Sequence, residues 1–368
     1  MPTMPDPPPE DVEVGGDWVN DRGEWDDGGE LELCGDPCRE PCCDPSYFAS
    51  VGGLIFTRDR PRFRQISFDD TDLVGQVLST HSGLGRWDGG VQVDFGWQLT
   101  PDCALKATYW GLFGARTTTT VYAADLTGHL NTAFDLRPLN IAGSGNVNDD
   151  IFDAAHAHRI RRDYEVHNVE LNLLSGELPV TADGRLQVGY LAGVRYLRFT
   201  EEFHYASAQA EFGVDPASEG YYDINVGNDL WGVQLGGRAD WFVTPRFSIY
   251  TAPKFGIFGN YMEHSSHIHN INGSAIVGPG NPLAGDAFDI SSNRTEVSFV
   301  GEIDVGLDYQ FSPSLSAALG YRALAVSGLA YATDQIPNHF ADLPGVAAID
   351  HNADMILHGG YANVTVIW

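Results

Sequence analysis

The segment TEVSFVGEIDVGLDYQF, residues 295–311, alternates apolar and polar side chains over almost its whole length. One set of alternate positions is mainly apolar and carries Val297, Phe299, Ile303, Val305, Leu307, Tyr309 and Phe311. The other set is polar and carries Glu296, Ser298, Glu302, Asp304, Asp308 and Gln310. Successive side chains of a β-strand point to opposite faces, so a repeat of two over this length predicts one long strand with an apolar and a polar face.

The same repeat recurs along most of the chain. Besides 295–311, it is clear in residues 90–99, 185–199 and 230–243. Weaker versions occupy residues 47–57, 103–113, 163–174, 246–258, 314–326 and 355–368. Together these segments predict about ten strands, or twelve if two more lie in the connections between them.

The connections between these strands alternate in length. The short ones are polar or proline-containing turns at residues 100–102, 175–184, 244–245 and 312–313. The intervening ones are long and occupy residues 58–89, 114–162, 200–229, 259–294 and 327–354. Short turns at one end and long loops at the other are typical of an up-and-down antiparallel β-barrel in the outer membrane, whereas a Greek-key sandwich gives no reason for such alternation. We therefore expect an all-β transmembrane barrel over residues 47–368.

The composition argues against several other classes of protein. Only 19% of the residues are charged, Gly occurs 42 times and aromatic residues make up 11%, which suits strands and turns better than helices. No stretch approaches the roughly 18 apolar residues that a membrane helix needs. The net charge of -29 disfavours binding to nucleic acid.

Residues 1–46 differ from the rest of the chain. They contain fourteen acidic residues against only Arg22 and Arg39, and they are rich in Pro and Gly. Such a segment cannot bury enough apolar surface to fold, so it predicts a disordered acidic tail. Its first ten residues, MPTMPDPPPE, have neither the basic start nor the apolar core of a secretory signal. We expect the mature form of a secreted protein or a misplaced start codon, with a cytoplasmic protein as the alternative.

In an outer-membrane barrel, the apolar strand faces point to lipid and the polar faces point to the lumen. The charged residues that we expect in a lumen-facing polar network are Asp94, Lys106, Glu170, Arg195, Arg238, Asp240, Lys254, Glu302, Asp304 and Arg322. About eight strands give a barrel filled by side chains, and about sixteen are needed for a wide channel. Ten strands therefore predict a lumen largely filled by ion pairs, among them Arg322 with Glu302 or Asp304 from the adjacent strand. The alternative is a set of solvated charges on the outer face of a soluble sheet.

The last segment, MILHGGYANVTVIW, ends in Trp368, with Val364 and Val366 on the same face. A final strand that ends in an aromatic residue resembles the assembly signal of outer-membrane proteins, which implies the barrel-assembly machinery as a partner. With VELNLL at 169–174 and VGYLAGVRYLRFTEEF at 188–203, it makes residues 47–368 resemble a family of outer-membrane β-barrels of unassigned function. This family is remotely similar to the porin-type major outer membrane proteins of Gram-negative bacteria. The resemblance implies a location in the bilayer of the outer membrane, and it implies no activity and no cofactor.

Two other groups of side chains could carry chemistry. The segment EHSSHIHN contains His264, His267 and His269, which could bind a transition metal, although a polar surface loop is the favoured interpretation. The cysteines are Cys34, Cys38, Cys42, Cys43 and Cys103. Their spacing does not match paired zinc modules, and disulfides are expected in an oxidising compartment. Cys103 lies beside a predicted short turn on the same side as the tail, so it could pair with a tail cysteine.

No catalytic motif stands out in the sequence. It contains no GxSxG motif, no Walker loop and no dinucleotide fingerprint, and the paired Asp and His signatures of the omptin proteases, which are also ten-stranded barrels, are not apparent. We therefore expect no enzyme, no metal and no catalytic residue. The expected role is structural, or interaction with surface partners through the long external loops. Two alternatives stay open: a porin-like passive diffusion channel for small solutes, and a secreted soluble β-barrel or sandwich that binds a ligand.

Overall fold

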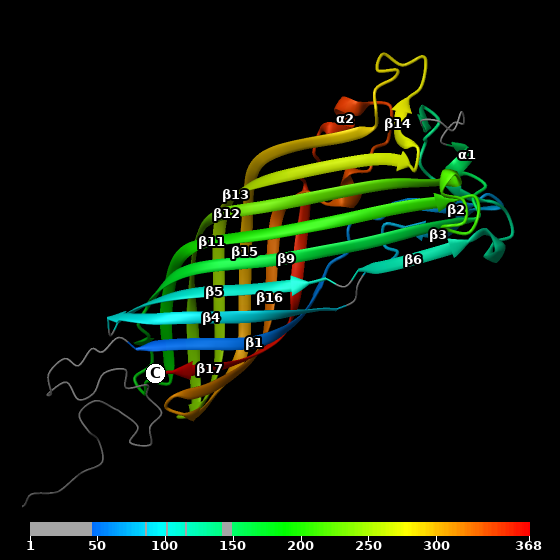
Figure 1. Ribbon diagram of the computed structural model, residues 1–368. Helices are drawn as coiled ribbons and strands as arrows, with labels where there is room; N and C mark the ends of the chain where they lie inside the picture. The colour runs from blue at the N-terminus through cyan, green and yellow to red at the C-terminus, as the bar shows by residue number, and fades with distance from the viewer. Residues whose placement is uncertain (1–45, 85–86, 101, 115, 142–148) are drawn as a thin grey trace, which may run out of the picture.

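The computed structural model describes residues 46–84, 87–100, 102–114, 116–141 and 149–368. Ten antiparallel strands in this part of the chain form the wall of a closed barrel (Figure 1). They are β1 (Tyr47–Arg58), β4 (Asp88–Thr100), β5 (Cys103–Phe113), β9 (Ala157–Ser175), β11 (Leu186–Ala208), β12 (Glu219–Thr244), β13 (Phe247–Asn270), β15 (Asp289–Ser312), β16 (Leu315–Leu329) and β17 (Ala353–Ile367). The predicted all-β, up-and-down barrel of about ten strands is confirmed, and each predicted segment lies almost completely within one of these strands.

The seam of the barrel uses the last residue of the chain. The backbone N–H of Tyr47 donates to the carbonyl of Trp368, and the N–H of Trp368 donates to the carbonyl of Tyr47, both at 2.9 Å. The two rings stack with centroids 6.3 Å apart. Trp368 therefore joins β17 to β1 at the end of the barrel that carries the short turns, where Cys103 begins β5. The other four cysteines, Cys34, Cys38, Cys42 and Cys43, and almost all of the predicted tail lie outside the described residues.

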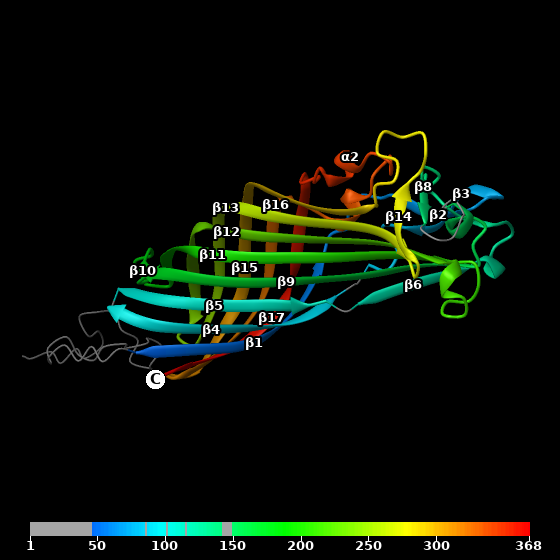
Figure 2. The same cartoon turned by 45° about the horizontal axis from the view of Figure 1, so that its top comes forward.

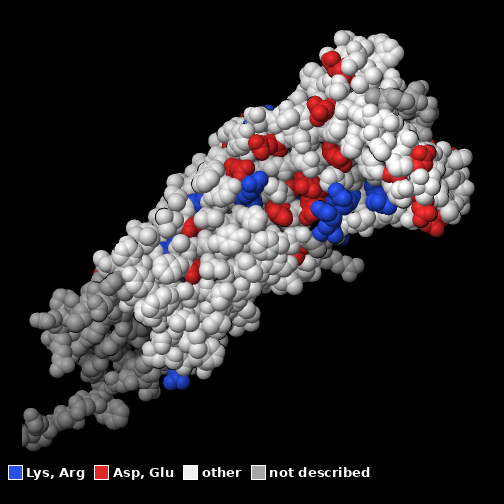
Figure 3. Space-filling model, in the orientation of Figure 1, with Lys and Arg blue, Asp and Glu red and all other residues white. Residues whose placement is uncertain are grey.

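The outward face of the wall carries an apolar belt. On β12 this face presents Trp231, Val233 and Leu235, which are 65%, 57% and 69% exposed. Farther from the short turns, the same face becomes polar at Asn225 and Asp223. In Figure 3, most of the visible charged side chains lie on the half of the molecule away from the short turns. Uncovered apolar side chains on the wall are expected where a barrel meets lipid, and polar ones where it leaves the bilayer.

Aromatic rings mark the outer boundary of this belt. The rings of Tyr196 on β11 and Trp231 on β12 lie 4.2 Å apart, and the Tyr196 hydroxyl donates to the Asp229 carboxylate. The next outward residue on β11 is Arg198, whose side chain is 50% exposed. Because Tyr and Trp favour the membrane–water interface, we infer that the wall leaves the bilayer near these residues.

Four strands continue far beyond this boundary. β11, β12, β13 and β15 contain 23, 26, 24 and 24 residues, whereas about 9–11 residues suffice to cross the bilayer. Figure 2 shows β9, β11, β12 and β13 running on toward the end that carries β14 and α2. The connections that we predicted as long loops at 200–229 and 259–294 are therefore mostly strand, which corrects that prediction.

Smaller elements cover the outer end of the barrel and form a packed cap. β2 (Gln65–Asp69) lies between β3 (Asp72–Ser79) and β7 (Leu130–Thr132), and β8 (Leu139–Ile141) pairs with β14 (Gly273–Val277). The other cap elements are β6 (Thr117–Tyr122), η1 (Ala123–Asp125), α1 (Asp149–Phe152), η2 (Pro216–Ser218), η3 (Ala332–Gln335) and α2 (Leu343–Ala347). The short strand β10 (Leu178–Pro179) lies instead at the short-turn end and pairs with β11.

The cap has a hydrophobic core of its own. Representative buried residues of this core are Ile66, Phe134, Phe203, Tyr222 and Phe340. They come both from the cap elements and from the inward faces of the extended strands, so the cap is packed into the outer end of the barrel. Among the described residues, no helix has the length and apolar character that a membrane crossing requires.

Candidate functional site in the barrel lumen

The alternation along each strand places the charged residues inside the barrel. On β15, Glu302 is 4% exposed, whereas its neighbour Ile303 on the outward face is 46% exposed. The structure gives the same inward orientation to every residue of the predicted lumen-facing network. The question for function is therefore which of these side chains meet inside the barrel.

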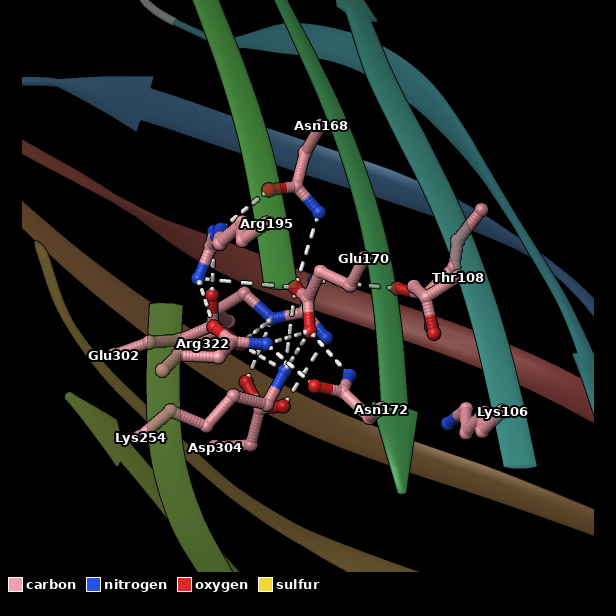
Figure 4. A network of polar contacts seen from close by, with 12 residues as sticks. Lys106, Thr108, Asn168, Glu170, Asn172, Arg195, Lys254, Glu302, Asp304 and Arg322 are labelled. Atoms are coloured by element: carbon pink, nitrogen blue, oxygen red, sulfur yellow. Dashed lines mark hydrogen bonds and ion pairs between the residues drawn. The ribbon is translucent and has the colours of Figure 1, made fainter. Parts of the chain in front are cut away.

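Charged side chains from different strands meet in the lumen (Figure 4). Lys254 Nζ lies 3.0 Å from Glu170 Oε2 and 2.9 Å from Glu302 Oε1. Arg195 Nη2 lies 2.9 Å from Glu302 Oε2. One ammonium and one guanidinium thus hold together two carboxylates that would otherwise repel each other.

The remaining pair joins adjacent strands. Arg322 on β16 donates to Asp304 on β15 through Nε at 2.7 Å and through Nη2 at 3.1 Å, and its Nε lies 3.6 Å from Glu302 Oε1. The six charged residues that we call the central cluster are Glu170, Arg195, Lys254, Glu302, Asp304 and Arg322. Three positive and three negative charges balance in this cluster, which is the condition under which buried charges are tolerated.

Neutral amides complete the shell around Glu170. Asn168 donates to its Oε1 at 3.0 Å, while Asn172 and Gln234 donate to its Oε2 at 2.9 and 2.8 Å. Sequence analysis did not single out these amides. Their positions on β9 and β12 share the inward parity of Glu170 and the other charged residues, and that parity was the signal that could have identified them.

Two smaller groups extend the network. Lys106 Nζ lies 3.1 Å from Asp94 Oδ1. Arg238 donates to both carboxylate oxygens of Asp240 at 2.7 and 2.8 Å, and to Asp308 at 3.3 Å. The side chains of Lys106 and Arg238 are 31% and 38% exposed, so these groups are wetter than the central cluster.

An apolar layer lies on the outer side of the central cluster. On β11, Arg195 is followed on the inward face by Leu197 and Phe199, and on β16, Arg322 is followed by Leu324, all three apolar side chains being fully buried. Other members of this apolar layer are Leu54, Phe56, Trp110, Leu112, Leu230, Val326, Met355 and Leu357. The lumen thus contains a polar layer and, between it and the cap, an apolar one.

The three histidines considered as a possible metal site do not come together. His264 faces inward and is 2% exposed. His267 and His269 face outward, and their stacked rings have centroids 4.5 Å apart. They follow His264 by three and five positions, and residues an odd number of positions apart lie on opposite faces of a strand. Among the described residues, no group of three or more His, Cys, Asp and Glu side chains is placed to hold a metal ion. The hypothesis of a site shared by these three residues is therefore wrong.

Two histidines instead share one carboxylate on the outward face beyond the apolar belt. His204 Nδ1 lies 2.7 Å from Asp223 Oδ1, and His269 Nε2 lies 2.9 Å from Asp223 Oδ2. The hydrogen bond to Asp223 raises the pKa of each of these histidines above its ordinary value, against the opposing effect of burial. Burial alone would raise the pKa of Asp223, but the hydrogen bonds from both histidines lower it. Burial lowers the pKa of the neighbouring His267.

This arrangement predicts a pH-dependent stability of the outer ends of β11, β12 and β13. A group whose pKa is raised by folding contributes stability at low pH and loses it as the pH rises through the raised pKa. We therefore expect backbone amides near Asp223 to be better protected from hydrogen exchange at about pH 6 than at about pH 8.5, after correction for intrinsic rates. The variant Asp223→Asn should strongly reduce this difference, leaving only the contribution of Glu202, whose Oε2 lies 3.3 Å from His204 Nε2. Equal pH dependence in the variant and the native protein would contradict the prediction.

The closed barrel, its apolar belt, its short turns at one end and its folded cap at the other define a bacterial outer-membrane β-barrel protein of the porin-like kind. The secreted soluble alternative is therefore excluded. A family model described as "Putative beta barrel porin-7 (BBP7)" matches residues 90–352, which is more than half of the chain. The chain belongs to this family. No curated protein matches the sequence.

Several solved outer-membrane barrels are similar to this chain. The outer membrane protease OmpT from Escherichia coli is 12% identical, with 88% of this chain and 96% of that chain covered and a TM-score of 0.42. The toluene transporter TbuX from Ralstonia pickettii is 13% identical, with 88% of each chain covered and a TM-score of 0.30. A major outer membrane protein from Thermus thermophilus is 11% identical, with 88% of this chain and 99% of that chain covered and a TM-score of 0.32.

Proposed function

We propose that this protein is a non-conducting barrel that has a structural role or binds surface partners through its cap, and that the barrel-assembly machinery is its partner during insertion. The stacking of the apolar layer on the central cluster is the observation that carries the proposal. Glu170 and Glu302 are 1% and 4% exposed, and Phe56 and Trp110 are fully buried. A solute would have to separate ion pairs in a poorly hydrated lumen and also displace the apolar layer. The proposal assigns no catalytic activity to the protein.

The construction of the cap supports a role in surface interactions. Besides its hydrophobic core, the cap is held by hydrogen bonds to Asp69. The Asp69 carboxylate accepts from the backbone N–H groups of Thr71, Thr127 and Gly128 at 2.9, 3.1 and 3.3 Å. These hydrogen bonds connect the end of β2 to the segment before β7. A surface held in one conformation loses little conformational entropy when a partner binds, so the cap suits recognition better than irregular loops would.

Reconstitution of the purified protein into planar lipid bilayers tests the closed lumen. The fold is checked beforehand by heat-modifiable migration on a gel, so that silence is not mistaken for misfolding. We expect no stepwise conductance from the folded barrel, because an ion would have to cross both the central cluster and the apolar layer inside a narrow barrel of ten strands. Reproducible conductance steps from the folded protein would contradict the proposal.

A passive diffusion channel for small solutes is the second candidate function. The observation that favours it is the partial exposure of Lys106 and Arg238, 31% and 38%, which gives part of the lumen a wet, charged lining. For a solute to pass through the lumen, the apolar layer and the cap would have to move. Swelling of liposomes that contain the folded protein, in sugars of increasing size, would then show a size cut-off, which a closed barrel lacks.

A further inference from the structure

A cleft of about 370 Å³ opens near the outer end of the barrel. Its deepest residues are Arg58 on β1, Arg162 on β9 and Glu201 on β11, whose side chains are 6%, 4% and 1% exposed. Trp87, which is 52% exposed, stands at the mouth. None of these residues belongs to the central cluster, from which the apolar layer separates them.

The deep end of the cleft carries an excess of positive charge. Glu201 Oε1 accepts a hydrogen bond from Arg162 Nη2 at 2.7 Å and a second one from Arg58 Nη2. Glu201 Oε2 accepts from the backbone N–H of Ala332 at 2.9 Å. One carboxylate is therefore shared by two guanidinium groups, which leaves this triad with a net charge of +1 in a site that water hardly reaches.

The same guanidinium groups have donors without partners. Arg162 Nη1 donates to the carbonyl of Thr80, but Arg162 Nε, Arg58 Nε and Arg58 Nη1 are buried without a hydrogen-bond partner among the described residues. Buried donors are almost always paired in folded proteins, and an unpaired buried charge is strongly destabilising. Both guanidinium groups therefore provide charge and hydrogen-bonding capacity that an anion could use.

Aromatic side chains surround these donors. The guanidinium carbon of Arg58 lies 4.5 Å from the centre of the Tyr164 ring, 5.4 Å from that of Phe199 and 5.3 Å from that of Tyr331. The rings offset part of the unpaired charge through cation–π contacts. Together with Trp87, the Tyr164 ring also gives the cleft an apolar wall for the body of a ligand.

We infer that this cleft binds a small monocarboxylate with an aromatic or aliphatic body. Its carboxylate would accept from the unpaired N–H groups of Arg58 and Arg162, because hydrogen bonds from a guanidinium to a carboxylate are charge-assisted and therefore strong. A single negative charge balances the triad. The other charged residues that line the cleft, Asp59, Arg60 and Asp163, add one net negative charge, which disfavours anions of higher charge. This inference goes beyond the proposed function and does not depend on whether the lumen conducts.

Isothermal titration calorimetry on the full-length protein, folded in detergent micelles, tests the inference. The probes are benzoate, its neutral relative benzamide and inorganic phosphate. We expect saturable binding of benzoate and at least tenfold weaker binding of both benzamide and phosphate. Absence of saturable benzoate binding by the folded native protein, or equal binding of benzamide, would overturn the inference. Phosphate binding as tight as that of benzoate would overturn the choice of a monocarboxylate.

Two variants of the triad separate binding from a merely structural role. Arg58→Met leaves a neutral Arg162–Glu201 pair and should weaken benzoate binding at least tenfold. Glu201→Gln removes the competing carboxylate and keeps both cations, so it should strengthen benzoate binding severalfold, whereas a purely structural triad would give weaker or unchanged binding. Arg294→Met is the matched control, because Arg294 pairs with Glu296 on the exposed part of β15 and does not line the cleft.

A variant at the mouth keeps the test decisive if either change in the triad prevents folding. Trp87→Ala alters an exposed side chain, so the barrel should fold normally. We expect benzoate binding to weaken severalfold while binding of acetate, which has no aromatic body, stays unchanged. Unchanged benzoate binding in this variant would contradict the placement of the ligand in the cleft.

Discussion

Replacing Glu302 with glutamine is expected to lower the free energy of unfolding of the barrel by about 3–5 kcal/mol. The Glu302 carboxylate lies 2.9 Å from Lys254 and 2.9 Å from Arg195, and its side chain is fully buried. Its loss leaves the central cluster with an excess positive charge that solvent cannot screen. Equilibrium unfolding in urea, followed by tryptophan fluorescence of the protein in lipid vesicles, measures the effect.

Two further variants control this experiment. Glu296→Gln changes a carboxylate on the same strand, but Glu296 pairs with Arg294 at an exposed site, so we expect a loss of only about 0–1 kcal/mol. The double variant Glu302→Gln with Lys254→Gln restores charge balance and should be more stable than Glu302→Gln alone. If Glu302→Gln were no more destabilising than Glu296→Gln, the central cluster would not be a buried, charge-balanced unit.

Replacing Leu235 with arginine is expected to destabilise the barrel in a bilayer by about 2–4 kcal/mol. Leu235 lies on the outward face of β12 within the apolar belt and is 69% exposed, so the arginine would face the hydrocarbon core. Asn225→Arg is the matched control on the same face of the same strand, beyond the belt, and should have almost no effect. Folding equilibria in vesicles measure both variants, and equal effects would contradict the placement of the membrane boundary near Trp231.

The ten strands could be predicted because the evidence for them is local. A repeat of two, as in residues 295–311, is visible within one strand, and a short turn such as 244–245 is visible between two. The inward orientation of charges such as Glu302 followed from the same repeat together with the reversal of faces that lipid imposes on a barrel.

The extended strands escaped prediction because the polarity of their faces reverses outside the bilayer. On β11, Tyr196 is outward and Arg195 is inward, but farther along His204 is outward and Phe203 is inward. The alternation is unbroken, yet the apolar face has moved from lipid to the core of the cap. Without the position of the membrane boundary, such a segment resembles an irregular polar loop.

The apolar layer escaped prediction for a related reason. On β1, the polar Ser50 and the apolar Phe56 both lie on the inward face. A face that mixes polar and apolar residues does not reveal, from the sequence alone, that its apolar part is packed inside the barrel. The possible metal site at the three histidines rested on their closeness in the sequence, whereas strand parity separates His264 from His267 and His269.

The sequence by itself indicated about ten strands, the alternation of short turns with long excursions between them, and the face on which each charged residue of the lumen lies. These properties depend only on neighbouring residues and on the two-residue period of a strand. Which side chains meet was decided by the tertiary structure, because closure of the barrel brings together residues far apart in the chain. Glu170 reaches Lys254 across the lumen, and Arg58 reaches Glu201 from a strand 143 positions away. The strength of an ion pair falls with distance and with access to water, and both are set only when the barrel is closed and filled.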